Sequence, residues 1–302
     1  MMARGERYGG VYVLAQPPRF GLANRLFPWA RASVYSANHG YPMLAVRWGQ
    51  LKVGPTLRRE RDAQLYLSLF RQHPAYVSGL ERRAALRGPH TVEPKHLDVA
   101  VSPDRPTVVT FSGLGRFFEQ LTASDAFLTD QLLAVVRRSR LPSPSEMVPL
   151  VAHVRLGDFG NAVTPMPWFV RRVEELRRAG IDAPIGVVSD GAERELQPLL
   201  DLRGVTLVRT GSAIGDLLVA ACSQALIGSS HSTFSAWAAF LGRQPVTFLD
   251  GGDMVGLEDL FPSRIAASTE DDGHQFVDRV RSALNDSSEL RTLVIRRKDG
   301  GP

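Results

Sequence analysis

The sequence predicts an α/β fold with two structured halves, the second of them built on a parallel β-sheet. In that second half, apolar runs of strand length alternate with segments of helix length, the pattern of a parallel sheet with crossover helices. A segment rich in Pro and Ser, residues 141–149 (LPSPSEMVP), separates the halves. The chain has 302 residues, enough for two domains of ordinary size or for one large α/β unit. We therefore expect an N-terminal domain at residues 1–144 and a C-terminal domain at residues 145–302.

The first half opens with a strand and a helix and then becomes less regular. Residues 50–105 contain helical pieces but no clear sheet pattern. Ser124 or Asp125 is the expected N-cap of the last helix in this half. The predicted strands are 10–16, 42–48 and 106–112, and the predicted helices are 21–40 and 124–138.

The second half predicts a Rossmann-like sheet, whose sites open at the carboxyl ends of the strands. Residues 296–302 (RRKDGGP) look like a loose tail. The predicted strands are 149–155, 183–190, 204–210, 224–230 and 245–250, and the predicted helices are 165–180, 192–202, 214–223 and 231–242.

Composition limits the class of protein. Hydrophobic content of 44% and charged content of 22% are typical of a globular protein, and no window approaches a membrane span. A single cysteine, Cys222, excludes an internal disulfide framework, so we expect a reducing, cytoplasmic location. The net charge is +5 and the pI about 9.7, but the arginines are scattered among acids, as on solvated helix faces. We therefore expect no nucleic-acid partner.

The most informative stretch is AHVRLGDF, residues 152–159. It places His153, Arg155 and Asp158 at the end of a buried strand, where charge is costly. Two interpretations remain open. Either these side chains hold one another in a structural network, or an anion lies in front of them.

A second stretch runs from a strand straight into a helix that begins near Ser232. Unpaired amides and the helix dipole make such a start an anion site, and hydroxyls could add donors. The alternative is an ordinary N-cap by Ser230 or Ser232 with the other hydroxyls solvated. Because Arg155 ends a neighbouring strand, a phosphate site is the favoured hypothesis. The hydroxyl residues are Ser229, Ser230, Ser232 and Thr233.

A third stretch, FGLANRLFPWA at residues 20–30, opens the first helix. It lacks the G-x-G-x-x-G fingerprint, so a nicotinamide cofactor is not supported. With its apolar residues packed inward, Asn24 and Arg25 are expected to face a cleft.

No metal or nucleophile motif accompanies these stretches. H-E-x-x-H, D-x-D and G-x-S-x-G are all absent from the sequence. Asp190 and Asp216 also fall at strand or helix ends. For each of them, the alternative to a role in a site is a structural role as a helix cap.

Together the three stretches resemble the fucosyltransferases that use GDP-fucose. They are most similar to the α-1,2-fucosyltransferase family (glycosyltransferase family 11), with kinship to α-1,6 and protein O-fucosyltransferases. GLANRLFPWA resembles G-L-G-N-Q-L-F-x-Y-A, and AHVRLGDF resembles H-V-R-R-G-D-Y. Residues 216–241 resemble D-L-x-x-M-s-x-C-x-x-x-I-x-S-N-S-S-F-S-W-W-A-A-Y-L. The chain departs from the pattern at Ala23, Arg25, Leu156 and Ala236, and Leu156 replaces the second arginine.

The resemblance implies a fold and a set of roles. The fold would be GT-B-like, α/β with two Rossmann-like domains facing across a cleft, the C-terminal one holding the nucleotide. Arg155 would pair with the β-phosphate as the sugar leaves. Asn24 would lie near sugar and acceptor, and Asp158 is the candidate base. The remaining nucleotide contacts would be His153 and Asp216 with guanine, and Ser230, Ser232, Thr233 and Phe234 around the phosphates.

The implied reaction is an inverting, metal-independent transfer of fucose from GDP-fucose to a hydroxyl of a glycan or glycoconjugate, in bacterial polysaccharide assembly. It needs no cofactor and no transmembrane segment, and peripheral contact with a membrane stays open. One alternative is another GDP-sugar such as GDP-mannose, because Leu156 alters the pocket. The other is a basic polyanion-binding protein with a degenerate nucleotide pocket.

Overall fold

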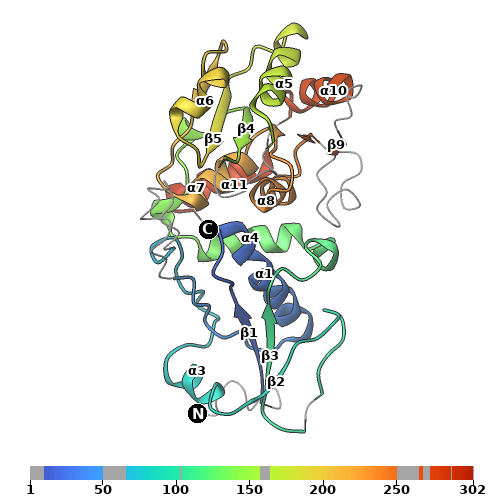
Figure 1. The fold of residues 1–302 in the computed structure, drawn as a ribbon. Coiled ribbons are helices and arrows are strands. Elements are labelled where there is room, and N and C mark those ends of the chain that lie inside the picture. Colours follow the sequence, from blue (N-terminus) through green and yellow to red (C-terminus); the bar gives the residue numbers. More distant parts are fainter. Residues whose placement is uncertain are drawn as a thin grey trace. The chain divides into compact units, whose positions relative to one another are not determined.

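The computed structural model describes residues 10–49, 66–102, 104–156, 164–249, 265–267, 273–286 and 288–301 (Figure 1). These residues fall into two compact units. The N-terminal unit ends at Val136 and the C-terminal unit begins at Arg137, ahead of the Pro- and Ser-rich segment.

The N-terminal unit is built on a parallel sheet with the strand order β1-β3-β2. Residues 42–48, predicted as a strand, instead form only isolated bridges within the described part of the chain, from Met43 to Val13 and from Leu44 to Val77. Strand β2 lies in the region without a recognisable sheet pattern, and the sequence missed it. The strands are β1 (Val11–Gln16), β2 (His90–Val92) and β3 (Thr107–Ser112).

Helix α1 follows β1 and packs on β1 and β3. It ends at Gly40, whose left-handed φ of 69° suits a residue without Cβ, and the predicted helix end is confirmed. Ser124 is the N-cap residue of α4, one of the two predicted candidates. The helices of this unit are α1 (Leu22–His39), α3 (Gly79–Ala85) and α4 (Asp125–Val135).

The C-terminal unit contains the predicted parallel sheet extended by one strand, β9, that the sequence did not predict, with the order β6-β5-β4-β7-β8-β9. From β4 the chain passes to β5 and β6 on one side, and β7 to β9 extend the sheet on the other. The order therefore reverses between β4 and β7. The strands are β4 (Leu150–Val154), β5 (Ile185–Ser189), β6 (Val205–Leu207), β7 (Ala225–Ile227), β8 (Val246–Phe248) and β9 (Ile265–Ala267).

Side chains on alternate positions of β4 enter one core with residues of α5, α6 and α10. The helix α11 runs to Asp299, so the prediction of a loose tail from residue 296 is wrong. The helices are α5 (Met166–Arg178), α6 (Glu193–Leu200), α7 (Ala213–Ala221), α8 (Thr233–Gly242), α10 (Gly273–Ala283) and α11 (Glu289–Asp299).

None of the helices in the described ranges is both long and apolar enough to cross a membrane.

Candidate functional site

Two of the predicted stretches, those of Arg155 and Ser232, meet where the strand order reverses. His153 lies in β4 and Arg155 just beyond it, while Ser229 to Ser232 follow the neighbouring strand β7. Ligands of open parallel sheets bind outside the carboxyl ends of the strands at such a reversal. The topology thus brings together two stretches that are more than seventy residues apart in sequence.

Ser229 joins these two strand ends. Its hydroxyl donates to the carbonyl of His153 at 2.9 Å and accepts from the amide of Arg155 at 2.8 Å. The hydroxyl therefore forms hydrogen bonds with the backbone on both sides of Val154. Its role in this structure is to hold the loop that carries Arg155 against the start of α8.

His153 is buried and lies against α8. Its Nδ1 is 2.6 Å from the hydroxyl of Ser235, and its ring stacks on Phe234 with centroids 4.6 Å apart and an interplanar angle of 21°. Burial, and secondarily the charge of Arg155, lowers the pKa of His153 from 6.5 to about 3. The imidazole is therefore neutral at physiological pH.

Helix α8 begins with Ser232 as its N-cap, one of the two residues named in the alternative interpretation of this stretch. The hydroxyl of Ser232 accepts from the amide of Ser235. Within the described ranges, the structure gives no partner for the amides of Thr233 and Phe234, which belong to the first turn. Two such amides at the positive end of a helix dipole can bind an anion.

Ser230 is more constrained than the sequence indicated. Its amide donates to the hydroxyl of Thr164 at 2.9 Å, and its own hydroxyl accepts from the amide of Leu249 at 3.1 Å. The residue is 5% exposed. Its contacts within the described ranges hold three loops together at this edge of the sheet.

The guanidinium of Arg155 forms an ion pair with Asp190, at 2.6 Å from Nη1 to Oδ2. The other carboxylate oxygen of Asp190 accepts from the amide of Leu156 at 2.9 Å. The helix-cap interpretation of Asp190 is wrong, because the N-cap residue of α6 is Ala192. Asp190 was noticed in the sequence as a strand-end residue, but nothing local to it revealed Arg155 as its partner.

Asp216 lies in the first turn of α7 and is half-buried. Its Oδ1 accepts from both the amide and the hydroxyl of Thr210, at 3.2 and 2.8 Å. The N-cap residue of α7 is Ser212, so Asp216 is not the cap. The contact of Asp216 with guanine stays a prediction.

Two predicted site residues of α1 have different environments. Asn24 is half-buried, and its shielded Oδ1 has no hydrogen-bond partner among the described residues. The expectation that Arg25 faces a cleft is wrong. Arg25 is 2% exposed, and its guanidinium donates to the carbonyls of Pro18, Arg47 and Trp48 at 2.6, 3.2 and 2.6 Å.

Asp158 lies outside the described residues. Within those residues, no group of three or more His, Cys, Asp or Glu side chains is placed to hold a metal ion.

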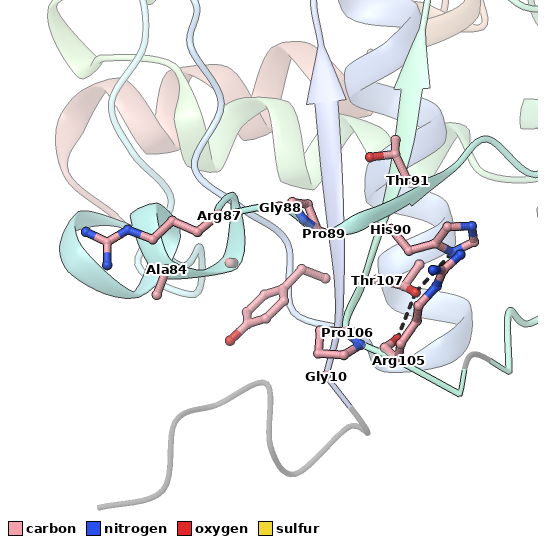
Figure 2. Close-up of a pocket in the computed structure, with 12 residues that line it drawn as sticks. Gly10, Ala84, Arg87, Gly88, Pro89, His90, Thr91, Arg105, Pro106 and Thr107 are labelled. Atoms are coloured by element: carbon pink, nitrogen blue, oxygen red, sulfur yellow. Dashed lines mark hydrogen bonds between the residues drawn. The ribbon is translucent and has the colours of Figure 1, made fainter.

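A separate cavity of about 440 Å³ lies at the amino-terminal edge of the other sheet, in the N-terminal unit (Figure 2). Gly10, His90 and Thr107 stand at the beginnings of its three strands. Arg87 and Arg105 are exposed on its rim and extend in different directions. None of the predicted site residues lines this cavity.

Each of the two α/β units is built on a parallel sheet, as in a GT-B-like fold, which confirms the predicted fold class. The same fold occurs in the NodZ α-1,6-fucosyltransferase co-crystallised with GDP, with a TM-score of 0.53 and 16% identity. The match covers 79% of this chain and 94% of that one. Selenomethionine fucosyltransferase NodZ from Bradyrhizobium gives a TM-score of 0.53 at 15% identity, over the same shares of the two chains. No family model and no curated protein matches the sequence.

Proposed function

We propose that this chain is a glycosyltransferase that moves fucose from GDP-fucose to a hydroxyl of a glycan or glycoconjugate. One observation carries the proposal: at the reversal of strand order, Ser229 ties the backbone of Arg155 to the loop that opens α8. The backbone that carries a guanidinium and the start of a helix are thereby held at one edge of the sheet. Both groups suit phosphate oxygens. The shared fold with a fucosyltransferase that was crystallised with GDP supports the choice of nucleotide.

The proposed roles follow from the chemistry of each group. The amides of Thr233 and Phe234 and the hydroxyl of Thr233 would bind phosphate oxygens. Arg155 would neutralise the charge that grows on the β-phosphate, an interaction that strengthens in the transition state. His153, held neutral, and the carboxylate of Asp216 would contact guanine. A carboxylate suits the ring N–H and the exocyclic amine of guanine as acceptor.

In the proposed reaction, an acceptor hydroxyl attacks the anomeric carbon as the bond to GDP breaks. The electron pair of that bond goes to the β-phosphate oxygen, and the configuration inverts. Asp158 or the departing phosphate would take the hydroxyl proton. Asn24 would contact sugar and acceptor from the N-terminal unit. No metal is required, because Arg155 and the α8 amides supply the positive charge.

We further propose a linkage and a cellular role for the transfer. The sequence motifs favour an α-1,2 linkage and a cytoplasmic role in bacterial polysaccharide assembly. GDP-mannose is the alternative donor, since Leu156 stands where the resemblance has a second arginine. Leu156 packs close to Gly191, where an added Cβ would come within 2.5 Å of its side chain. An assay of the nucleotide released from a panel of nucleotide sugars would distinguish these donors. The same assay with and without EDTA would test whether transfer requires a metal.

The first test is nucleotide binding. GDP at about 100 times its Kd should stabilise the protein by roughly 2.7 kcal/mol, and UDP should not. Arg155→Ala should abolish the GDP-induced rise in melting temperature. The matched control is Arg203→Ala, because Arg203 is an exposed arginine that pairs with Asp182 at the other end of β5. Equal shifts with GDP and UDP, or binding that falls steeply with salt, would instead favour the polyanion-binding alternative.

A further inference from the structure

The carboxylate of Asp190 contacts both the side chain of Arg155 and the backbone that follows it. Oδ2 is 2.6 Å from Nη1 of Arg155, and Oδ1 is 2.9 Å from the amide of Leu156. One acidic side chain just after β5 therefore restrains two groups just after β4. A charge-assisted contact of this length orients a guanidinium more strongly than a neutral hydrogen bond does.

Asp190 is itself held in place. It follows Ser189, which pairs with Val154 in the parallel register. The hydroxyl of Ser189 accepts from the amide of Gly191 at 3.0 Å, which closes the turn around Asp190. The turn lies so close to the end of β4 that a Cβ on Gly191 would collide with Leu156. The carboxylate therefore has a defined position relative to Arg155.

The pair is shielded but accessible. The side chains of Arg155 and Asp190 are 27% and 22% exposed. Partial burial strengthens the attraction relative to an ion pair in bulk water. The remaining exposure lets a ligand reach the guanidinium.

We propose that Asp190 is a positioning residue that orients the Arg155 guanidinium toward the β-phosphate of the nucleotide. This inference rests on the function proposed above. It predicts the direction in which the affinity for GDP changes when the charge of Asp190 is removed. A nearby carboxylate repels a diphosphate, so a purely electrostatic role predicts that removing its charge tightens GDP binding. A positioning role predicts that GDP binding weakens.

The experiment compares GDP with GMP by isothermal titration calorimetry. Asp190→Asn keeps an acceptor for the amide of Leu156 but loses the charge that holds Arg155. We expect its Kd for GDP to rise about tenfold, the scale of one charged hydrogen bond. GMP has no β-phosphate, so its Kd should change less than about twofold. Asp190→Glu moves the charge by one methylene and should show the same selective loss of GDP affinity. This variant replaces Asp190→Asn in the experiment if Asp190→Asn does not fold.

The matched control is Asp182→Asn, which breaks the exposed ion pair with Arg203 in the same unit and should leave both Kd values unchanged. Tighter or unchanged GDP binding in the Asp190 variants overturns the positioning role. Equal loss for GDP and GMP overturns it as well, because that result indicates general damage to the site. Wild-type protein that binds neither nucleotide refutes the proposed function itself, and the positioning role with it.

Discussion

His153 and Ser235 are joined by a 2.6 Å hydrogen bond that ties the end of β4 to the first turn of α8. The Ser235 hydroxyl also accepts from the amide of Ser229 at 3.1 Å. This arrangement favours the hydroxyl proton pointing at Nδ1, and hence the tautomer with its proton on Nε2. The imidazole therefore holds its position as a neutral group.

The low pKa of His153 predicts a pH dependence of stability. Its folded-state pKa of about 3 lies below the ordinary 6.5, so between these values the unfolded chain binds more protons. The free energy of unfolding should fall as the pH drops below about 6.5, by up to about 1.4 kcal/mol per pH unit. Urea unfolding between pH 4 and 8 would measure it. His153→Asn should show a shallower dependence over this range, and an equally steep curve in that variant would refute the assignment.

Ser232 should matter for both stability and nucleotide binding. Ser232→Ala removes the N-cap of α8, which should cost about 1 kcal/mol. It should also weaken GDP binding, because the first turn would no longer be held. Ser288→Ala removes the corresponding N-cap of α11, where the hydroxyl accepts from the amide of Arg291. That control should lose similar stability and keep its GDP affinity, as measured by urea unfolding and calorimetry.

Arg25 should be essential to the N-terminal unit. Arg25→Met keeps an apolar stem but deprives the carbonyls of Pro18, Arg47 and Trp48 of a buried donor. We expect a loss of roughly 3 kcal/mol in the free energy of unfolding. Arg83 is exposed in α3, so Arg83→Met should change it by less than about 0.5 kcal/mol. Arg25→Met with wild-type stability would show that these bonds contribute little.

Substitution of Asn24 should affect sugar transfer without lowering the stability of the protein. Its shielded Oδ1 has no partner in the described part of the chain, and Ala is the better helix former. Asn24→Ala should leave the stability unchanged or raise it by about 0.5 kcal/mol, and should abolish sugar transfer. Asn38→Ala, at an exposed position of the same helix, should give the same stability and full transfer. Transfer that survives Asn24→Ala would remove this residue from the site.

The alternation of strands and helices could be predicted because it depends on local hydrophobic periodicity. For the same reason, His153, Arg155 and the Ser-rich helix start could be assigned to strand ends before the sheet was known. Strand β2 is only three residues long and has no clear local signal, whereas residues 42–48 have the apolar pattern of a strand but, among the described residues, form isolated bridges only at Met43 and Leu44. The helices α10 and α11 were not predicted, and the charged residues 296–299 of α11 carry no apolar periodicity that would indicate a helix.

The sequence by itself determined the α/β class and the residue types available at the strand ends. Only the tertiary structure decided their partners. The strand order places β4 between β5 and β7, which brings Asp190 to Arg155 and Ser235 to His153. In the N-terminal unit, packing buries Arg25, which the sequence assigned to a cleft, against the carbonyls of Pro18 and Trp48. Such pairings depend on long-range packing, because a charged side chain is stabilised by whichever groups the fold brings within hydrogen-bonding distance.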